Sequence, residues 1–470
     1  MSGPALSSRV STGGSTRPYQ ISWREGSRTA ERDHTVHLMT GPRDGPLIVL
    51  DDDPTGTQSM ENVPVLLEWD DTLVRAAVLS RPPAVHLLTN SRAFPPARAA
   101  EIVRSAAQAA VDALGRPRLV LRGDSTLRAH LLEEYLAVRD VAFPGRTPPL
   151  LLVPALPHAG RITVGGVHLL VQDGLRTPLH DTEFAADPSF AYRDARLLRW
   201  AEERSAGFFR AEAGREIHLD TLRSDGPSAV ARALLELAEA GLPAACAPDA
   251  ETLADLAVIA KGLQAAEAEG ADVLVRSAPT FVGVLAGNLA RDRVPPPDAN
   301  GRLLVVCGSH VPLSTRQLAA VIDAYTDSLV EVDVLALAGR NAAAEVERAA
   351  REATRRLDRD GLAVVATPRE RPAATQSFEV GERIADNLAR VVRMIDPPPG
   401  AVVSKGGITS AVLARVGLGA RAGLVLGPLV DGVALWRVEG DRGRIPFVVF
   451  PGNVGADGTL LDVVRLILTA

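Results

Sequence analysis

An apolar run meets three carboxylates in the stretch Leu47-Ile-Val-Leu-Asp-Asp-Asp-Pro-Thr-Gly56. Four apolar residues followed by Asp, Pro and Gly predict a buried strand that ends in a tight turn. In an open parallel sheet, ligands bind beyond the carboxyl ends of the strands, where these aspartates fall. Adjacent carboxylates repel one another unless a cation, a hydroxylated ligand or nearby arginines offset the repulsion. The stretch therefore predicts a ligand site at a strand end, with a purely structural Asp-rich turn as the alternative.

The chain around this stretch alternates short apolar runs with longer segments rich in Ala and Leu. Such alternation is typical of βα units around a mostly parallel sheet. Strands are predicted at 47–50, 63–67, 85–88, 119–121, 150–153, 273–275, 303–306, 363–366, 402–403, 424–426 and 447–450. Helices are predicted at 97–114, 126–138, 227–240 and 251–266, among others. The predicted fold class is α/β, with two domains that each have a central, mostly parallel sheet flanked by helices.

The length of 470 residues exceeds what one hydrophobic core usually supports, which predicts two domains. Residues 1–45 are rich in Ser, Gly, Thr and Arg, and we interpret them as a flexible leader. Residues 291–301 combine three consecutive prolines with polar residues and glycine, which is typical of a linker. The predicted domains are therefore 46–290 and 302–470, with the active site in the cleft between them.

The composition argues against several classes of partner. No apolar run approaches the roughly 20 residues of a membrane-spanning helix, so we expect no membrane role. The net charge is −6 and no dense basic stripe occurs, so nucleic acid is not the expected partner. Cys246 and Cys307 lie in apolar surroundings and fit buried, reduced thiols. Residues 1–45 lack the apolar segment of a secretory signal, so the cytoplasm is the expected compartment.

Two further polar loops follow predicted strands of the first half. Thr89-Asn-Ser-Arg92 comes after the strand at 85–88, and Arg122-Gly-Asp-Ser-Thr-Leu-Arg128 comes after the strand at 119–121. Because carboxyl ends of parallel strands meet at one edge of a sheet, we expect the arginines of both loops to converge there. The alternative for each arginine alone is a solvated surface charge.

The second of these loops carries the groups expected at an anion site. Asp124 or Ser125 is predicted to cap the following helix, whose N-terminal amides favour an anion. Arg122 and Arg128 bracket that cap. Guanidinium groups beside a helix N-terminus suit a ligand that bears a carboxylate.

A fourth polar segment, residues 154–168, follows the predicted strand at 150–153. It adds one further cation, Arg161, and two histidines, His158 and His168. Since a histidine is more often a satisfied structural residue than a catalyst, neither receives a role.

The second half contains glycine-rich turns after predicted strands. They are Gly308-Ser-His310, Lys405-Gly-Gly-Ile-Thr409 and Pro451-Gly-Asn-Val-Gly455. Backbone amides in such turns can approach phosphate oxygens closely. None of the three is a Walker A loop or a protein-kinase glycine loop, and an ordinary turn is the alternative for each.

One lysine stands out because nearly every cationic residue of the chain is an arginine. Of 51 Lys and Arg residues, only Lys261 and Lys405 are lysines. Lys405 stands beside a Gly-Gly pair, where an ammonium group can act as a point charge on phosphate. Thr409 and Ser410 are predicted to cap the next helix and to offer a hydroxyl to phosphate or to a metal ion.

The order of these motifs resembles the four-carbon acid sugar kinases. The resemblance spans residues 46–465, and the joint order is more specific than any single motif. It is carried by Asp51-Asp-Asp-Pro-Thr-Gly56, Thr89-Asn-Ser-Arg92, Arg122-Gly-Asp-Ser-Thr-Leu-Arg128, Gly160-Arg-Ile-Thr-Val-Gly-Gly-Val-His168, Asp181-Thr-Glu-Phe-Ala-Ala-Asp-Pro188, Gly308-Ser309 and Gly406-Gly-Ile-Thr409.

The resemblance implies an N-terminal acid-sugar-binding domain, a C-terminal nucleotide-binding domain and ATP between them. It implies threonate, erythronate, 3-oxo-tetronate or related acids as substrates, phosphorylated on a hydroxyl. The implied nucleotide contacts are Ser309, Gly406, Gly407, Ile408, Thr409 and Gly452. Two departures stand out: Ile408 replaces a common acidic residue, and Phe450-Pro-Gly452 replaces a Lys-Ser-Gly turn. Lys405 is the candidate for the missing charge.

The resulting hypothesis is an ATP-dependent kinase of small sugar acids that uses MgATP. The expected catalytic base is Asp52 or Asp124. The sequence does not identify the ligands of the metal ion, and it leaves open whether the protein forms a homodimer. Two other functions stay open: an NAD-dependent oxidoreductase, against which no G-x-G-x-x-G follows the first strand of either half, and a non-catalytic acid-sugar sensor. The expected substrate-binding residues are Asp51, Asp53, Ser91, Arg92, Arg122, Ser125, Arg128 and Arg161.

Overall fold

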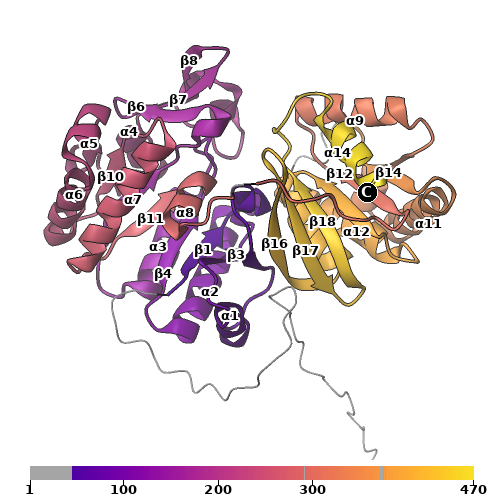
Figure 1. Cartoon of the computed structure of the whole chain (residues 1–470), viewed down its shortest axis with the longest axis horizontal. Coiled ribbons are helices and arrows are strands. Elements are labelled where there is room, and N and C mark those ends of the chain that lie inside the picture. Colours follow the sequence, from indigo (N-terminus) through magenta and orange to yellow (C-terminus); the bar gives the residue numbers. More distant parts are fainter. Residues whose placement is uncertain (1–44, 291, 371, 373–374, 376) are drawn as a thin grey trace, which may run out of the picture.

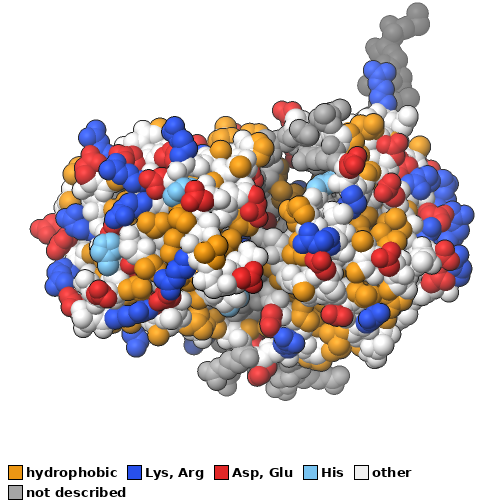
Figure 2. Space-filling model, turned by 90° about the horizontal axis from the view of Figure 1, so that it is seen from above, with side chains coloured by type: hydrophobic (Ala, Val, Ile, Leu, Met, Phe, Trp, Pro, Cys, Tyr) orange, Lys and Arg blue, Asp and Glu red, His pale blue; other side chains and the backbone are white. Residues whose placement is uncertain are grey.

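The computed structural model describes residues 45–290, 292–370, 372, 375 and 377–470. The predicted leader therefore lies outside the described residues, apart from Gly45. Two α/β halves stand side by side, the first coloured indigo to red and the second orange to yellow (Figure 1). Seen from above, the surface is hollowed where the halves meet, and side chains of both charges are interspersed over this face (Figure 2).

The first half is built mainly of βα units. Its strands are β1 (Leu47–Asp51), β2 (Val63–Leu66), β3 (Ala84–Leu88), β4 (Arg118–Arg122), β5 (Leu150–Val153), β6 (Arg161–Val164), β7 (Val167–Gln172), β8 (Leu175–Pro178), β9 (Arg215–Ile217), β10 (Ala245–Pro248) and β11 (Leu274–Ser277). Its α-helices are α1 (Asp71–Val78), α2 (Pro96–Leu114), α3 (Leu131–Ala142), α4 (Leu197–Arg204), α5 (Leu219–Asp225), α6 (Pro227–Ala240), α7 (Leu253–Ala268) and α8 (Pro279–Ala286). Short 3₁₀ turns η1 (Pro54–Thr57) and η2 (Ser91–Ala93) follow β1 and β3.

The second half adds parallel strands and an antiparallel unit of three strands. Its strands are β12 (Leu303–Cys307), β13 (Leu329–Glu331), β14 (Leu362–Ala366), β15 (Ala401–Lys405), β16 (Ala420–Val430), β17 (Val433–Gly440) and β18 (Gly443–Phe450). Its α-helices are α9 (Pro312–Ala324), α10 (Val334–Ala338), α11 (Ala342–Asp360), α12 (Phe378–Met394), α13 (Gly407–Val412) and α14 (Thr459–Leu468).

One mixed sheet runs through both halves. Within the described residues its order is β13-β14-β12-β15-β18-β17-β16-β2-β3-β1-β4-β11-β5-β10-β9. The prediction of a separate sheet in each domain is therefore wrong in this respect. The join is the antiparallel pairing of β2 with β16, which aligns Leu66 with Ala422 and Val63 with Val425. Each half would otherwise expose an unpaired strand edge here, and the pairing satisfies both edges.

Strand register brings the polar loops of each half together. In the first half, the last residue of β1, Asp51, aligns with Leu88 of β3 and Arg122 of β4. In the second half, Cys307 of β12 aligns with Lys405 of β15, which aligns in turn with Phe450 of β18. The loops that follow these strands therefore start at one level of the sheet in each half.

Two local predictions differ from the structure. The helix predicted at 126–138 begins only at Leu131, because Leu127 has a φ of +66° in the left-handed region, which a helix cannot include. The strand predicted at 424–426 is the middle of the longer β16, whose antiparallel partner β17 had no prediction. The small sheet β6-β7-β8 was also not predicted.

In the described part of the chain, no helix has the length and apolarity to span a membrane.

Candidate active site

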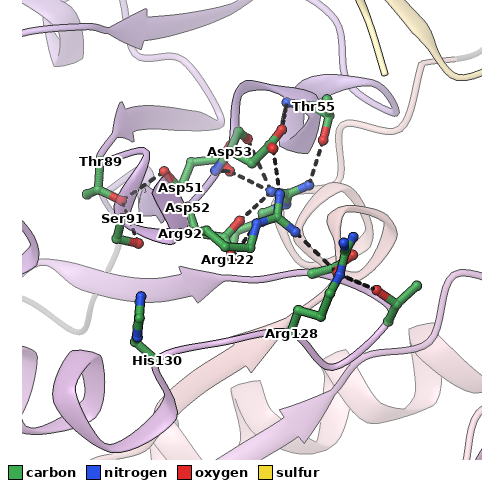
Figure 3. A network of polar contacts seen from close by, with 12 residues as sticks. Asp51, Asp52, Asp53, Thr55, Thr89, Ser91, Arg92, Arg122, Arg128 and His130 are labelled. Carbon is green, nitrogen blue, oxygen red and sulfur yellow. Dashed lines mark hydrogen bonds and ion pairs between the residues drawn. The ribbon is translucent and has the colours of Figure 1, made fainter. Parts of the chain in front are cut away.

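The acidic loop, residues 51–55, lies at the centre of the first-half site (Figure 3). Its first residue, Asp51, is fully buried: one carboxylate oxygen lies 2.8 Å from Nδ1 of His86 and the other 3.1 Å from Nη1 of Arg122. The same carboxylate packs against Gly56, where a Cβ atom would overlap it. Asp51 is thus a structural anchor of the turn, because it is buried and both of its carboxylate oxygens already have partners.

Asp52 has the most reactive environment of the three aspartates. Its Oδ1 accepts a hydrogen bond of 2.7 Å from Nη1 of Arg122, whereas its buried Oδ2 has no hydrogen-bond partner and lies 3.9 Å from Nε of Arg92. Burial raises the pKa of the Asp52 carboxyl to about 7, although Arg92 and Arg122 act in the opposite direction. A carboxyl group with one free oxygen and a pKa near neutrality is suited to accept a proton.

Asp53 is held ionised. Burial alone would raise its pKa, but the charges of Arg92 and Arg122 and hydrogen bonds from Thr55 lower the pKa below its ordinary value. Nη2 of Arg92 lies 2.5 Å from Oδ2 of Asp53, and Nη1 of Arg92 lies 3.2 Å from Asp124. Arg92 therefore ties the acidic loop to the loop after β4 (Figure 3).

The loop after β4 does not cap a helix, so the predicted capping by Asp124 or Ser125 is wrong. Instead, the Asp124 carboxylate accepts hydrogen bonds from Nε of Arg128, at 2.7 Å, and from the Thr126 hydroxyl. Burial opposes ionisation, but Arg128 and Arg92 keep the pKa of Asp124 far below its usual range. The carbonyl of Ser125 lies 2.9 Å from Nε2 of His168, which gives that histidine a structural role.

Arg161, the first residue of β6, differs from the other arginines of the site. Its Nη1 donates a 2.8 Å hydrogen bond to the carbonyl of Ala159, and no carboxylate of the described residues lies within ion-pair distance. Its buried Nε has no partner. Arg161 and Arg128 lie over the same ring, Phe184, at 5.9 and 5.7 Å from its centroid. Two cations beside one ring, one of them without a carboxylate partner among the described residues, are chemically suited to an anionic ligand.

A buried ion pair beneath the site had no prediction. Ser91 faces inward and donates a 2.6 Å hydrogen bond to Glu134, whose other oxygen lies 2.5 Å from Nη1 of Arg276. Arg276 directly follows the predicted strand at 273–275, just as Arg122 follows the one at 119–121. The same position at a strand end is therefore the sequence signal that indicates Arg276. Glu134 lies inside a helix and carries no comparable sequence signal.

The three glycine turns of the second half converge. A Cβ atom on Gly308 would overlap the hydroxyl of Thr409, so the turns at 308–310 and 405–409 are in contact. Oγ of Ser314 lies 2.9 Å from both Oγ of Ser309 and the carbonyl of Gly452, which joins the turn at 451–455 to them. Helix α13 starts at Gly407 with Gly406 as its N-cap, so the predicted capping by Thr409 and Ser410 is wrong.

Lys405 lies beneath these turns. Its side chain is fully buried, with Nζ 2.5 Å from the carbonyl oxygen of Pro451 and 3.3 Å from that of Gly452. The ammonium group is also 4.0 Å from the centroid of the Phe450 ring. Direct contact with a phosphate, as expected from the sequence, does not fit this orientation.

The acidic loop and the glycine turns meet. A Cβ atom on Gly407 would overlap the carboxylate of Asp53, so the two groups are in contact across the halves. Nε1 of Trp436 in β17 donates a 2.9 Å hydrogen bond to Thr57 in η1. The two sets of loops are therefore in contact where the halves meet.

The glycine turns fit a nucleotide phosphate, because their backbones approach one another more closely than a side chain would permit. For Mg²⁺, no group of three or more His, Cys, Asp or Glu among the described residues is arranged to hold a metal ion. An ion that keeps mainly phosphate and water ligands, as Mg²⁺ commonly does with nucleotides, fits this site better than a protein-enclosed one.

Comparison with known families defines the class of protein. A family model described as a sugar-binding N-terminal domain matches residues 47–285. A second, described as a nucleotide-binding C-terminal domain, matches residues 304–460. The two models together cover most of the chain, and they assign sugar binding to the acidic-loop half and nucleotide binding to the glycine-turn half.

A relative identifies the family more closely. The D-erythronate kinase of Heliobacterium modesticaldum is 33% identical over 350 residues, covering 70% of this chain and 74% of the relative. The chain belongs to the four-carbon acid sugar kinase family. Two crystal structures share the fold. The protein from Haemophilus influenzae has a TM-score of 0.60 and 18% identity, over 90% of this chain and 100% of that chain. The protein from Salmonella typhimurium LT2 has a TM-score of 0.66 and 20% identity, over 89% of this chain and 99% of that chain.

Proposed function

We propose that this chain transfers the γ-phosphoryl group of ATP to a hydroxyl group of a four-carbon sugar acid, with D-erythronate as the first candidate. The class follows from the family, and D-erythronate is suggested by the kinase from Heliobacterium modesticaldum. The observation that carries the proposal is the buried Oδ2 of Asp52, which has no hydrogen-bond partner, in a loop that contacts the glycine turns through Asp53.

Asp52 is the proposed general base. Its Oδ2 accepts the proton of the substrate hydroxyl as that oxygen forms a bond to the γ-phosphorus, and the bond from phosphorus to the bridging oxygen of ADP breaks. Asp124 is less suited, because its low pKa and its three hydrogen-bonded or ion-paired partners disfavour proton uptake.

Arg128 and Arg161 are the proposed receptors for the substrate carboxylate. Arg92 and Arg122 are already engaged with Asp52 and Asp53, so their charges serve mainly to hold the acidic loop. Arg161 has no acidic partner among the described residues and is therefore the guanidinium group with most to gain from a carboxylate.

The proposed nucleotide contacts are Ser309, Thr409 and the backbone of the three glycine turns, with Mg²⁺ carried by the nucleotide. When bound, the ion would neutralise charge that develops on the phosphates. The domain limits 46–290 and 302–470 remain part of this proposal, with 291–301 as the connection.

The test measures ADP release with a panel of four-carbon acids: D-erythronate, L-erythronate, D-threonate, L-threonate and their 3-oxo relatives. Acid-dependent ADP release with at least one member is the expected result. ATP binding without turnover on any acid would support a sensor instead. Binding of NADH with no binding of ATP, followed by fluorescence, would support the oxidoreductase alternative.

A further inference from the structure

We propose that Lys405 positions the phosphate-binding loop, residues 451–455, from beneath and supplies an uncompensated positive charge to it, without touching the nucleotide. This inference rests on the proposed nucleotide site and adds a residue that acts through the backbone.

The carbonyl groups of this loop are held inward by buried side chains. Nζ of Lys405 binds the carbonyls of Pro451 and Gly452, and Ser314 donates a second hydrogen bond to the carbonyl of Gly452. Nε2 of Gln317 donates to the carbonyl of Val454 at 2.9 Å. Both Ser314 and Gln317 come from α9, so the loop is held between α9 and the end of β15.

The amide groups therefore point the other way. In a trans peptide, the C=O of one residue and the N–H of the next are antiparallel. With the carbonyls of Pro451, Gly452 and Val454 directed inward, the N–H groups of the residues that follow each of them are directed outward. No acceptor for the backbone N–H groups of residues 452–455 occurs among the described residues. A run of outward, unsatisfied amides is a binding site for phosphate oxygens.

The charge of Lys405 has no carboxylate partner within ion-pair distance in the described part of the chain. The titratable group facing it is Cys307, on the paired strand β12, and Sγ of Cys307 in turn lies 3.6 Å from Nη1 of Arg369. From β18 it meets the uncharged ring of Phe450. An anion above the loop is therefore the group best able to stabilise the ammonium form.

The consequence is a proton linked to nucleotide binding. Burial lowers the pKa of Lys405 to about 7, so at pH 8 most of the free protein carries a neutral amine here. A bound polyanion favours the ammonium form and raises that pKa, so binding at pH 8 takes up a proton. Affinity should fall as the pH rises above 7.

The experiment compares wild-type protein, Lys405→Met and the matched control Lys261→Met, which changes the only other lysine, an exposed residue of α7. ADP is titrated calorimetrically at pH 8 in two buffers of different ionisation enthalpy. We expect Lys405→Met to weaken ADP binding about tenfold or more, as for loss of a charge-assisted contact, and to abolish proton uptake. The KM for ATP should rise with little change in the KM for the acid, and Lys261→Met should match the wild type.

Unchanged ADP affinity and proton uptake in Lys405→Met would overturn the inference while leaving the kinase proposal intact. A wild type that binds no nucleotide would instead overturn the kinase proposal. Should Lys405→Met fail to fold, proton uptake on ADP binding is measured in Asp52→Asn instead, because that variant removes the other group with a pKa near 7. Proton uptake at pH 8 that persists in Asp52→Asn supports Lys405, and its loss there assigns the proton to Asp52.

Discussion

The acidic loop and the glycine turns bind their ligands by different means. In the acidic loop, function depends on side-chain charges that hold one another: Arg92 and Arg122 pair with Asp51, Asp52 and Asp53. In the glycine turns, the binding groups belong to the backbone. The nearby cations there, Lys405 and Arg369, are bonded to backbone carbonyls, with no carboxylate within ion-pair distance among the described residues.

This difference predicts how each region responds to mutation. In the first half, a change of one charge should alter catalysis or acid binding while the backbone stays in place. In the second half, the positions of the peptide groups are decisive, so an added carbon atom should matter more than a lost charge. Four predictions test the contrast.

The largest expected effect is on Asp52. Asp52→Asn removes the proposed base with almost no change of volume, so kcat should fall about 10²-fold or more, the size of a general-base contribution. With a pKa of about 7, the base becomes increasingly protonated as the pH drops below 7, so wild-type kcat/KM should fall there. Stopped-assay ADP release across roughly pH 5.5–8.5, a range centred on that pKa, measures both effects.

Two variants accompany this measurement. Asp140→Asn, on the exposed face of α3, should behave as the wild type. Asp124→Asn should reduce activity but keep the fall below pH 7. If Asp124→Asn loses that pH dependence and Asp52→Asn keeps it, the roles of the two aspartates are reversed.

The second prediction concerns the contact between the halves. Gly407→Ala places a methyl group where the Asp53 carboxylate lies, so either the acidic loop or the turn at 405–409 must move. Small displacements of reacting groups can lower turnover about 10²-fold, and we expect a loss of tens of fold in kcat with both KM values raised. Gly458→Ala is the control, because its added Cβ meets no atom nearer than 4.0 Å. Wild-type kinetics in Gly407→Ala would show that the contact between Asp53 and Gly407 is not needed for turnover.

The third prediction concerns recognition of the acid. Arg161→Gln removes the guanidinium that lacks an acidic partner, so the KM for the acid should rise about tenfold, as expected for a lost charged hydrogen bond, with the KM for ATP unchanged. Arg176→Gln, on β8 of the same small sheet, changes an exposed arginine paired with Glu251 and should have no such effect. A rise in the KM for ATP alone would remove Arg161 from the acid site.

The sequence predicted the parts of this site that depend on local pattern. Apolar runs followed closely by Asp, Gly or Arg located the ends of β1, β4 and β12, because strand ends and tight turns are determined by neighbouring residues, whereas the strand predicted at 402–403 extends to Lys405. The sequence could not predict the direction of Lys405, because its partners, Phe450 at the end of β18 and Pro451 just after it, lie far along the chain. A scarce lysine beside glycines indicated importance but not orientation.

Burial and pairing at long range explain the other differences. Asp52 and Asp124 look equivalent in sequence, and only their surroundings separate a carboxyl of raised pKa from one held ionised. The join of β2 to β16 was missed because antiparallel pairing between distant strands has no local signature. The sequence pattern predicts a helical conformation for Leu127, but its backbone is left-handed. In this conformation Asp124 accepts a hydrogen bond from Arg128 instead of capping a helix.

The smallest expected effect tests whether the halves behave as one unit. Thr57→Val removes the acceptor for the buried indole N–H of Trp436, and an unsatisfied buried donor costs about 1–3 kcal/mol of the free energy of unfolding. Thr57→Ser keeps the hydroxyl and is the matched control. Because the acidic loop starts only a few residues before Thr57, the loss should also appear as a slightly raised KM for the acid.

Urea unfolding is followed both by Trp fluorescence and by activity. The midpoints of the two transitions should shift together in Thr57→Val, since one sheet passes through both halves. Transitions that separate would mean that the β2–β16 pairing does not couple the halves.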